Sequence, residues 1–208
     1  MVLKRVLMPA AAIALVGSIG LAAPASAKLP KIGADGKIKA NKSIGGVKLD
    51  MSRANVEKKW GKGSCKTVPA GPGTPAQEQC DWSKTIPPSQ FDGEYAHVTF
   101  LGTGDGATAV IISITAHTRS TDSKVLKGKL SKWETPDGIH LGSKTAKVPE
   151  EFPGATTNSS TGVNGFDLFE GARPDLRYTR FTGGIGASAS KLIAISLQWD
   201  VCHYFDCS

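Results

Sequence analysis

An internal repeat constrains the fold of this chain more than any other feature of its sequence. Residues 46–60 (GVKLDMSRANVEKKW) and 138–152 (GIHLGSKTAKVPEEF) align without a gap at an offset of 92. Gly, Leu, Ala and Val recur at matching places, and Trp60 aligns with Phe152. A period this long lies outside the range of solenoid repeats, so the pattern predicts two copies of one larger unit.

Each copy carries the signals of a short helix. Ser52 stands where a helix N-cap is expected, and Val56 and Trp60, four residues apart, would face the same side. Gly61 would end this helix. In the second copy Pro149 lacks a backbone donor and crowds the preceding turn. We therefore expect the second helix to be kinked or irregular.

Strand-like segments follow each predicted helix. They cover residues 79–82, 95–101 and 108–116 after the first helix, and 165–170, 176–181 and 191–199 after the second. A helix and an antiparallel meander, given twice, predict an α+β fold of two tandem helix-plus-antiparallel-sheet units. The helices would cover one face of each sheet and leave the other face open.

The sequence divides into four parts on this interpretation. They are a signal peptide (1–27), a basic flexible N-terminal segment (28–43), a first α+β repeat (44–128) and a second (129–208). Lys4 and Arg5 precede an apolar run, and Ala25-Ser26-Ala27 has the small residues of a cleavage site, so we expect secretion with cleavage after Ala27. The alternative is a retained membrane anchor. Prolines and glycines interrupt the run, and we expect no membrane span in the mature chain.

Charge narrows the choice of partner. The formal net charge of +7 falls to +5 without Lys4 and Arg5, and lysines gather near the mature N-terminus and within residues 124–132. Such lysines are typical either of contact with anionic cell-wall polymers or an acidic partner, or of a solvated tail and linker, which we favour. Nucleic acid is not expected, because the chain has no DNA- or RNA-binding motif.

Four cysteines, Cys65, Cys80, Cys202 and Cys207, lie after the predicted cleavage site. An even number in an oxidising compartment predicts two disulfides. Of three connectivities we favour Cys65–Cys80 with Cys202–Cys207, because each pair closes a short loop rich in turn residues or lies at the chain end. Zinc is the alternative, but the spacings are not those of a zinc motif. No metal and no cofactor are expected.

A family resemblance rests on four stretches: residues 46–56, Gly61-Lys-Gly-Ser-Cys65, the Cys65–Cys80 loop, and residues 135–139 through 152–154. The organisation that they mark resembles the β-lactamase-inhibitor-protein fold and, more distantly, the small outer-membrane assembly lipoproteins of the BamE/SmpA type. The resemblance implies a concave sheet surface whose aromatic residues, with an acidic hairpin residue, contact a partner enzyme. By position Asp92 and Glu94 would be the acidic candidates.

Three departures from that family weaken the transfer of inhibitor activity. The Ser-Lys-Thr-Ile-Pro-Pro stretch differs, the second unit lacks a disulfide loop after its helix, and a C-terminal cysteine loop is added. The resemblance therefore implies a fold rather than an activity.

Binding is better supported than catalysis. The chain has no Gly-x-Ser-x-Gly, His-Glu-x-x-His or Cys-x-x-Cys motif, and its histidines are far apart, so we expect no enzyme. The candidate binding aromatics are Tyr95, Tyr178 and Trp199 on strands, and Tyr204 and Phe205 inside the C-terminal cysteine loop.

The predicted function is a secreted, non-catalytic module, with a protein inhibitor as one form of it, that binds another protein through an exposed sheet face. A cell-envelope structural or assembly protein held at the wall is the alternative, and a small hydrolase is the third hypothesis.

Overall fold

The structure is a computed structural model, and it describes residues 28–30, 36–72, 74–83, 92–118, 128–158, 165–184 and 190–200. The N-terminal half contains β1 (Ile38–Lys39), β2 (Ser43–Ile44), α1 (Arg53–Trp60), β3 (Ser64–Val68), β4 (Gln77–Ser83), β5 (Asp92–Leu101) and β6 (Thr108–Thr118). The C-terminal half contains the 3₁₀-helix η2 (Leu130–Lys132), α2 (Lys147–Glu151), β7 (Thr156–Asn158), β8 (Gly165–Glu170), β9 (Arg177–Gly183) and β10 (Leu192–Trp199).

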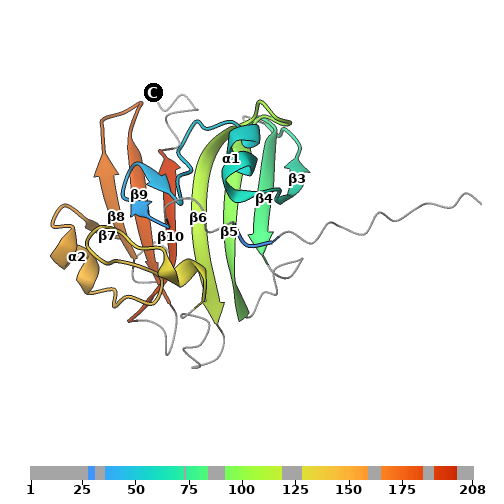
Figure 1. Cartoon of the computed structure of the whole chain (residues 1–208). Coiled ribbons are helices and arrows are strands. Elements are labelled where there is room, and N and C mark those ends of the chain that lie inside the picture. Colours follow the sequence, from blue (N-terminus) through green and yellow to red (C-terminus); the bar gives the residue numbers. More distant parts are fainter. Residues whose placement is uncertain are drawn as a thin grey trace, which may run out of the picture.

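The described chain is mostly β, so the expected α+β fold of two tandem helix-plus-sheet units is wrong. The helices α1 and α2 have only eight and five residues. Eight strands form one antiparallel sheet in the order β3-β4-β5-β6-β10-β9-β8-β7, and β1 and β2 form a separate hairpin (Figure 1). Two separate meanders would each leave a long edge strand with unpaired backbone groups. Pairing β6 with β10 satisfies those groups and merges the two sheets.

Main-chain hydrogen bonds show that the sequence repeat is also a structural repeat. The amide of Asp50 donates to the carbonyl of Ala109 at 2.8 Å, and its counterpart Gly142 donates to Leu192 at 2.8 Å. The returning bonds also correspond, from Ala109 to Met51 and from Leu192 to Ser143. Each copy therefore docks its helix-bearing segment against the start of the last strand of its own meander.

An approximate two-fold axis relates the two halves and passes through the middle of the β6–β10 pairing. Ser113 and Ser196 are partners at this point. The axis exchanges the pairs on either side of them, Ile112–Leu197 and Ile114–Ile195. Residues of β5 and β6 consequently have counterparts in β9 and β10 on the same face of the sheet.

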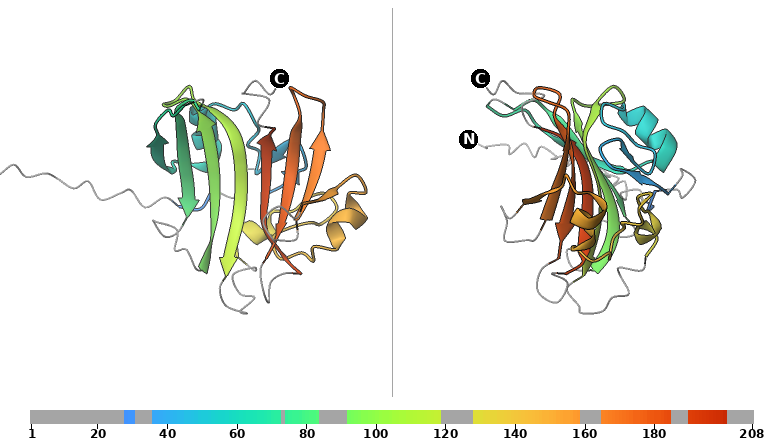
Figure 2. Two further views of the ribbon diagram at one scale, coloured as in Figure 1. Left: turned by 180° about the vertical axis from the view of Figure 1, so that it is seen from behind. Right: turned by 90° about the vertical axis from the view of Figure 1, so that its left-hand side faces the viewer.

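The covering elements lie on one side of the large sheet. Seen along the sheet edge, α1, the β1–β2 hairpin and η2 lie on the same side (Figure 2, right), and the view from behind looks directly onto the strands (Figure 2, left). Val148 of α2 is buried, and Phe152 stacks on Phe181 of β9 on this same side. The opposite side, called the open face below, is not covered by any described helix or hairpin.

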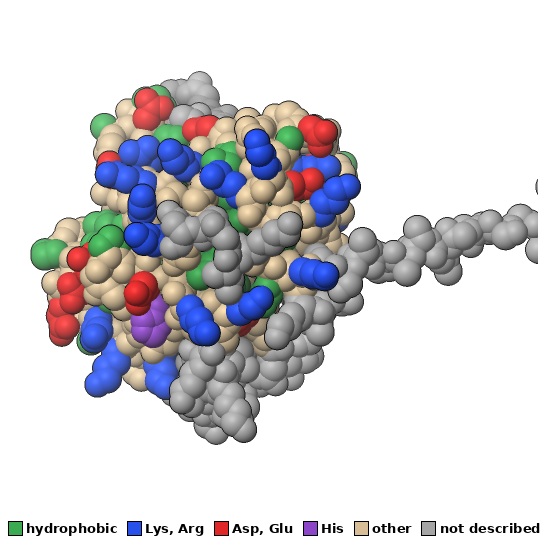
Figure 3. All heavy atoms as spheres, viewed as in Figure 1, with side chains coloured by type: hydrophobic (Ala, Val, Ile, Leu, Met, Phe, Trp, Pro, Cys, Tyr) green, Lys and Arg blue, Asp and Glu red, His purple; other side chains and the backbone are tan. Residues whose placement is uncertain are grey.

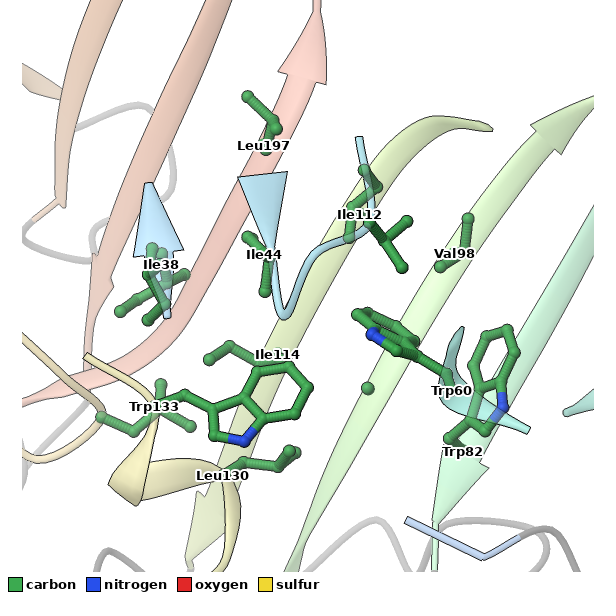
Figure 4. Packing of buried hydrophobic residues seen from close by; sticks show 14 of the residues in the cluster. Ile38, Ile44, Trp60, Trp82, Val98, Ile112, Ile114, Leu130, Trp133 and Leu197 are labelled. Carbon is green, nitrogen blue, oxygen red and sulfur yellow. The ribbon is translucent and has the colours of Figure 1, made fainter. Parts of the chain in front are cut away.

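Three tryptophans fill the core under the first half (Figure 4). The ring centroid of Trp60 lies 5.3 Å from that of Trp82 and 5.8 Å from that of Trp133. Nε1 of Trp60 donates to the carbonyl of Gly45 at 3.1 Å, and Nε1 of Trp82 donates to that of Gly61 at 2.8 Å. Gly45 has a φ of +55°, and a side chain there would run into the Trp133 ring. The hairpin can approach the core only because this residue is glycine.

Residues 36–43, which with 28–30 are the described part of the segment 28–43 that we expected to be basic and flexible, pack against the core together with Ile44. Ile38 and Ile44 of the β1–β2 hairpin are buried in the core between the hairpin and the sheet. The amide of Asn41 donates to Oγ1 of Thr179 at 2.6 Å, and that hydroxyl donates to Oδ1 of Asn41 at 2.9 Å. The two isoleucines supply enough apolar surface to hold the segment, while its lysines stay in solvent.

Both helices differ in detail from expectation. Ser52 occupies the N-cap position of α1, but its side chain forms no capping hydrogen bond. Pro149 is the third residue of α2, where a missing amide proton costs nothing because the first four amides of a helix have no intrahelical partner. Among the described residues, no helix is both long enough and apolar enough to cross a membrane.

Candidate functional site

A row of polar side chains crosses the centre of the open face. Because side chains alternate along each strand, the strand register decides which residues share this face. From β4 to β8 the row consists of Asp81, His97, Ser113, Ser196, Arg180 and Asp167. Counted from either end, the row has an acidic residue, then a basic residue, then a serine. The two-fold axis passes between the two serines and so relates one half of the row to the other.

In the first half of the row, Asp81 and His97 form a close pair. Nδ1 of His97 lies 2.7 Å from Oδ1 of Asp81, and Nε2 lies 3.0 Å from Oγ1 of Thr99. When a carboxylate, an imidazole and a hydroxyl are hydrogen-bonded in this spatial order, the imidazole can activate the hydroxyl as a nucleophile. Catalysis also needs a cavity to hold a substrate. Among the described residues, the cavities of about 440 and 300 Å³ are lined by other side chains, so neither of them lies at this group, and Thr99 itself is buried.

In the second half of the row, Asp167 and Arg180 form a two-point ion pair. Nε and Nη2 of Arg180 lie 2.8 and 2.9 Å from the two carboxylate oxygens of Asp167, and Asn158 donates to the same carboxylate at 2.7 Å. The hydrogen bond to Asp167 raises the pKa of Arg180. Two hydrogen bonds in a fixed geometry therefore make this pair a rigid element of the face.

Aromatic side chains flank the polar row. Tyr95 pairs with Thr115, and its two-fold counterpart Tyr178 pairs with Gln198. The Phe169 ring lies 5.2 Å from Tyr178, and the Arg180 guanidinium lies 5.2 Å from the same tyrosine ring. Burial raises the pKa of Tyr178, and the charge of Arg180 opposes this rise. The phenol of Tyr178 is therefore neutral at physiological pH.

Two other predicted site residues lie on the covered side of the sheet. Trp199 follows Ile195 and Leu197 on that side, and its Nε1 donates to Oδ1 of Asp50 at 3.2 Å. Glu94 accepts hydrogen bonds from the amides of Leu130 and Ser131, both at 3.1 Å. The Glu94 carboxylate therefore holds the start of η2 instead of facing a partner across the open face.

The remaining predicted residues are only partly covered by the structure. Asp92 is the first residue of β5, and its side chain lies outside the described residues. Tyr204, Phe205, Cys202 and Cys207 also lie outside them.

The predicted disulfide between Cys65 and Cys80 is confirmed, and it joins partner residues of β3 and β4. Glu78 lies close to both sulfur atoms. Because the sulfurs are bonded to each other, this group offers no thiolate to a metal. Glu78 itself is engaged by Arg53, whose Nη1 lies 2.6 Å from its carboxylate.

The sequence analysis missed His97, Arg180 and Phe169 as residues of this face, although the signal for their place on it was present. His97 lies two residues after Tyr95, and Arg180 lies two residues after Tyr178, so each shares the face of its tyrosine. Phe169 stands on a predicted strand beside Asp167. No family model, no curated protein and no solved structure matches the chain.

Proposed function

We propose that this protein is a secreted, non-catalytic module that binds another protein through the open face of its sheet. The supporting observation is the placement of Tyr95 and Tyr178 at two-fold-related positions, with Phe169 next to Tyr178. Tyrosine offers a large, rigid contact area at low entropic cost and is enriched at binding hot spots. The Cys65–Cys80 disulfide is compatible with an extracellular location.

An ordinary solvated sheet face is the simpler alternative, because antiparallel sheets often have one wet face. Phe169 argues against it. With 46% of its surface accessible, it is the one large hydrophobic residue that is exposed among those described. Its neighbour Tyr178 extends the apolar surface toward the centre of the face. Covering this aromatic pair with a partner removes its apolar surface from water, which is energetically favourable.

The charges of the face favour a folded protein as the partner over a polyanion. Asp81 contacts His97, and Arg180 is paired with Asp167, so the central row offers no cluster of unpaired cations to a polyanion. Ser113 and Ser196 place two neutral hydroxyl groups at its centre. A protein surface with an apolar patch and hydrogen-bonding groups complements this arrangement.

A capture experiment with a matched control tests the proposal. The face variant carries Tyr95→Ala, Phe169→Ala and Tyr178→Ala, and the control variant carries Asn55→Ala, Lys58→Ala and Lys59→Ala on the exposed side of α1. Immobilised wild type and control should retain a protein from secreted and envelope fractions that the face variant does not retain. The captured protein, once purified, should bind the face variant at least about tenfold more weakly, which corresponds to about 1.4 kcal/mol.

Retention of the same proteins by all three baits would count against the proposal. If the face variant loses its fold, as seen by circular dichroism, Phe169→Ser alone replaces it, because this side chain is exposed. Unchanged capture by a folded Phe169→Ser bait would then count against the proposal.

The inhibitor form of the proposal has its own test, motivated by the resemblance to β-lactamase-inhibitor proteins. Wild type and face variant are added to a panel of β-lactamases, and hydrolysis is followed. Slower hydrolysis with wild type but not with the face variant would support inhibition through the open face. Unchanged hydrolysis across the panel would reject the inhibitor form, and the capture experiment would then decide on binding.

A further inference from the structure

A second candidate surface lies on the covered side of the sheet, where the β1–β2 hairpin meets the ends of β9 and β10. A cavity of about 440 Å³ opens there, within the usual size range of small-ligand sites. The residues of its wall that carry charge or an aromatic ring are Lys39, Lys42, Lys48, Asp50, Arg177 and Trp199. None of them belongs to the open face.

The charge of this cavity is strongly unbalanced. Its wall has four cations and one carboxylate, and Figure 3 shows Lys and Arg side chains gathered over this part of the molecule. No carboxylate of the described residues lies within 4.0 Å of the ammonium groups of Lys39, Lys42 or Lys48, whereas Arg177 is paired with Glu170 at 3.2 Å. The three lysines therefore create a positive potential that the described protein groups do not neutralise.

Buried polar groups also line the cavity. Asn41 and Ser43 are only 6% and 5% exposed, and both contribute to the wall. The two hydrogen bonds between Asn41 and Thr179 use the backbone amide and Oδ1 of Asn41. Within the described residues, neither the side-chain amide nitrogen of Asn41 nor the hydroxyl of Ser43 has a hydrogen-bond partner. Neither atom is among the buried side-chain atoms of the described residues that lack a partner, so both are open to the cavity and can donate to a bound acceptor there.

Trp199 supplies an apolar wall beside these donors. Its indole Nε1 is directed to Asp50, and the Arg177 guanidinium lies 6.0 Å from the ring centroid. An aromatic wall next to a positive cavity suits a ligand that combines an anion with a carbon skeleton.

We propose that this cavity binds a phosphate ester of a polyol. Lysine ammonium groups act as compact point charges and are common phosphate ligands, whereas carboxylate recognition favours the two-point fork of arginine. The one arginine of the wall already pairs with Glu170. The phosphate is held by the lysines and the donors of Asn41 and Ser43, and the polyol lies against Trp199. The ligand is either a free phosphorylated polyol or a unit of a phosphodiester polymer.

Trp199 provides a direct readout of binding. The other three tryptophans are buried in the core, so its indole N–H signal in a ¹⁵N-labelled sample is the one that a ligand in the cavity can contact. Trp199→Phe identifies this signal. Titration with glycerol 3-phosphate, with poly(glycerol phosphate) and with glycerol distinguishes the sources. Saturable movement of the Trp199 signal with the first probe assigns a free ester, and movement with the polymer alone assigns a polymer.

Variants with equal loss of charge separate a site from general attraction. Lys39→Gln, Lys42→Gln and Lys48→Gln remove the cavity lysines, and Lys58→Gln, Lys59→Gln and Lys62→Gln remove three exposed lysines of α1 and the residues after it. The first set should weaken binding at least about tenfold and the second less than about twofold. Binding should also weaken as salt screens the lysines.

Three results would overturn the proposal. They are a Trp199 signal that moves with neither phosphate probe, one that moves as much with glycerol, and equal loss of binding in the two triple variants. Each is independent of the open face, so binding of a protein partner there would be unaffected by any of them.

Discussion

The two halves of the molecule pair their strands alike but fill their cores differently. In the first half Trp60 lies between Trp82 and Trp133, and its indole is hydrogen-bonded to the hairpin. In the second half Phe152, at the matching position of the repeat, stacks on Phe181 at 5.4 Å. Strand register is set by backbone hydrogen bonds and by alternation, so it tolerates such changes, whereas the covering layer must be repacked for each side chain.

The outer edges of the two halves also differ. Cys80 pairs with Val98, and at the corresponding place Phe166 pairs with Phe181. The first half ties its five-residue edge strand β3 to the sheet with a disulfide, whereas the edge strand β7 has three residues. A covalent bond and a short strand are two ways to limit an exposed sheet edge.

The largest expected effect tests whether the first half holds the main core. Trp60→Ala should lower the free energy of unfolding by about 3–5 kcal/mol, because it leaves a large cavity between two tryptophans. Phe152→Ala should cost less, since Phe152 is only partly buried. Equilibrium urea unfolding measures both. Equal losses would contradict a core concentrated under the first half.

The disulfide gives the next effect. Replacing Cys65 and Cys80 with alanine should lower the free energy of unfolding by about 3 kcal/mol, because the unfolded chain is no longer closed across a separation of 15 residues. Phe166→Ala, at the position corresponding to Cys80, should cost less because Phe166 is half-buried. Urea unfolding with and without a thiol reductant is the measurement. A wild type that loses no stability in reductant would contradict the role given to this bond.

A smaller effect compares the two acids of the central row. The Asp167 side chain is 6% exposed and accepts three hydrogen bonds, and the Asp81 side chain is 24% exposed and contacts one histidine. Asp167→Asn should cost about 1.5–3 kcal/mol of unfolding free energy, because Arg180 loses its charged partner. Asp81→Asn should cost less than about 1 kcal/mol. A larger loss of stability for Asp81→Asn than for Asp167→Asn would contradict the conclusion that the Asp167–Arg180 pair is the more firmly held of the two.

Much of the strand pattern was predictable, because six strands alternate clearly enough to be located. The edge strands were not. Ser64–Val68 is polar and Thr156–Asn158 is very short, so neither has a hydrophobic alternation. The pairing of β6 with β10 was also beyond prediction, because apolar strands such as these can pair with many partners and the choice is made by the tertiary structure.

The candidate site was partly predictable, because side chains alternate between the two faces along each strand. The sequence predicts Tyr95 and Tyr178 to be exposed aromatics, and both lie on the open face, where each is half-buried. Strict alternation would also have placed Trp199 with Ile195 and Leu197 on the covered side. The ion pairs could not be predicted, since they depend on which strands are neighbours.

The smallest expected effect concerns the ionisation of Tyr178. Burial raises its pKa above the ordinary value near 10, and the Arg180 charge opposes that rise. As pH increases past this ordinary value, the unfolded chain ionises first while the folded protein keeps its proton. The stability contributed by the neutral phenol is therefore complete below the unfolded pKa and is lost as pH rises through the folded pKa.

Phenolate absorbance measures this directly, as the difference between wild type and Tyr178→Phe across an alkaline titration. The difference curve should have its midpoint above the ordinary tyrosine value. Arg180→Met should move the midpoint higher still, because the guanidinium favours the phenolate. A midpoint at or below the ordinary value would show that Tyr178 is well hydrated. Its burial beside Phe169 would then no longer distinguish the second half of the open face from an ordinary wet surface.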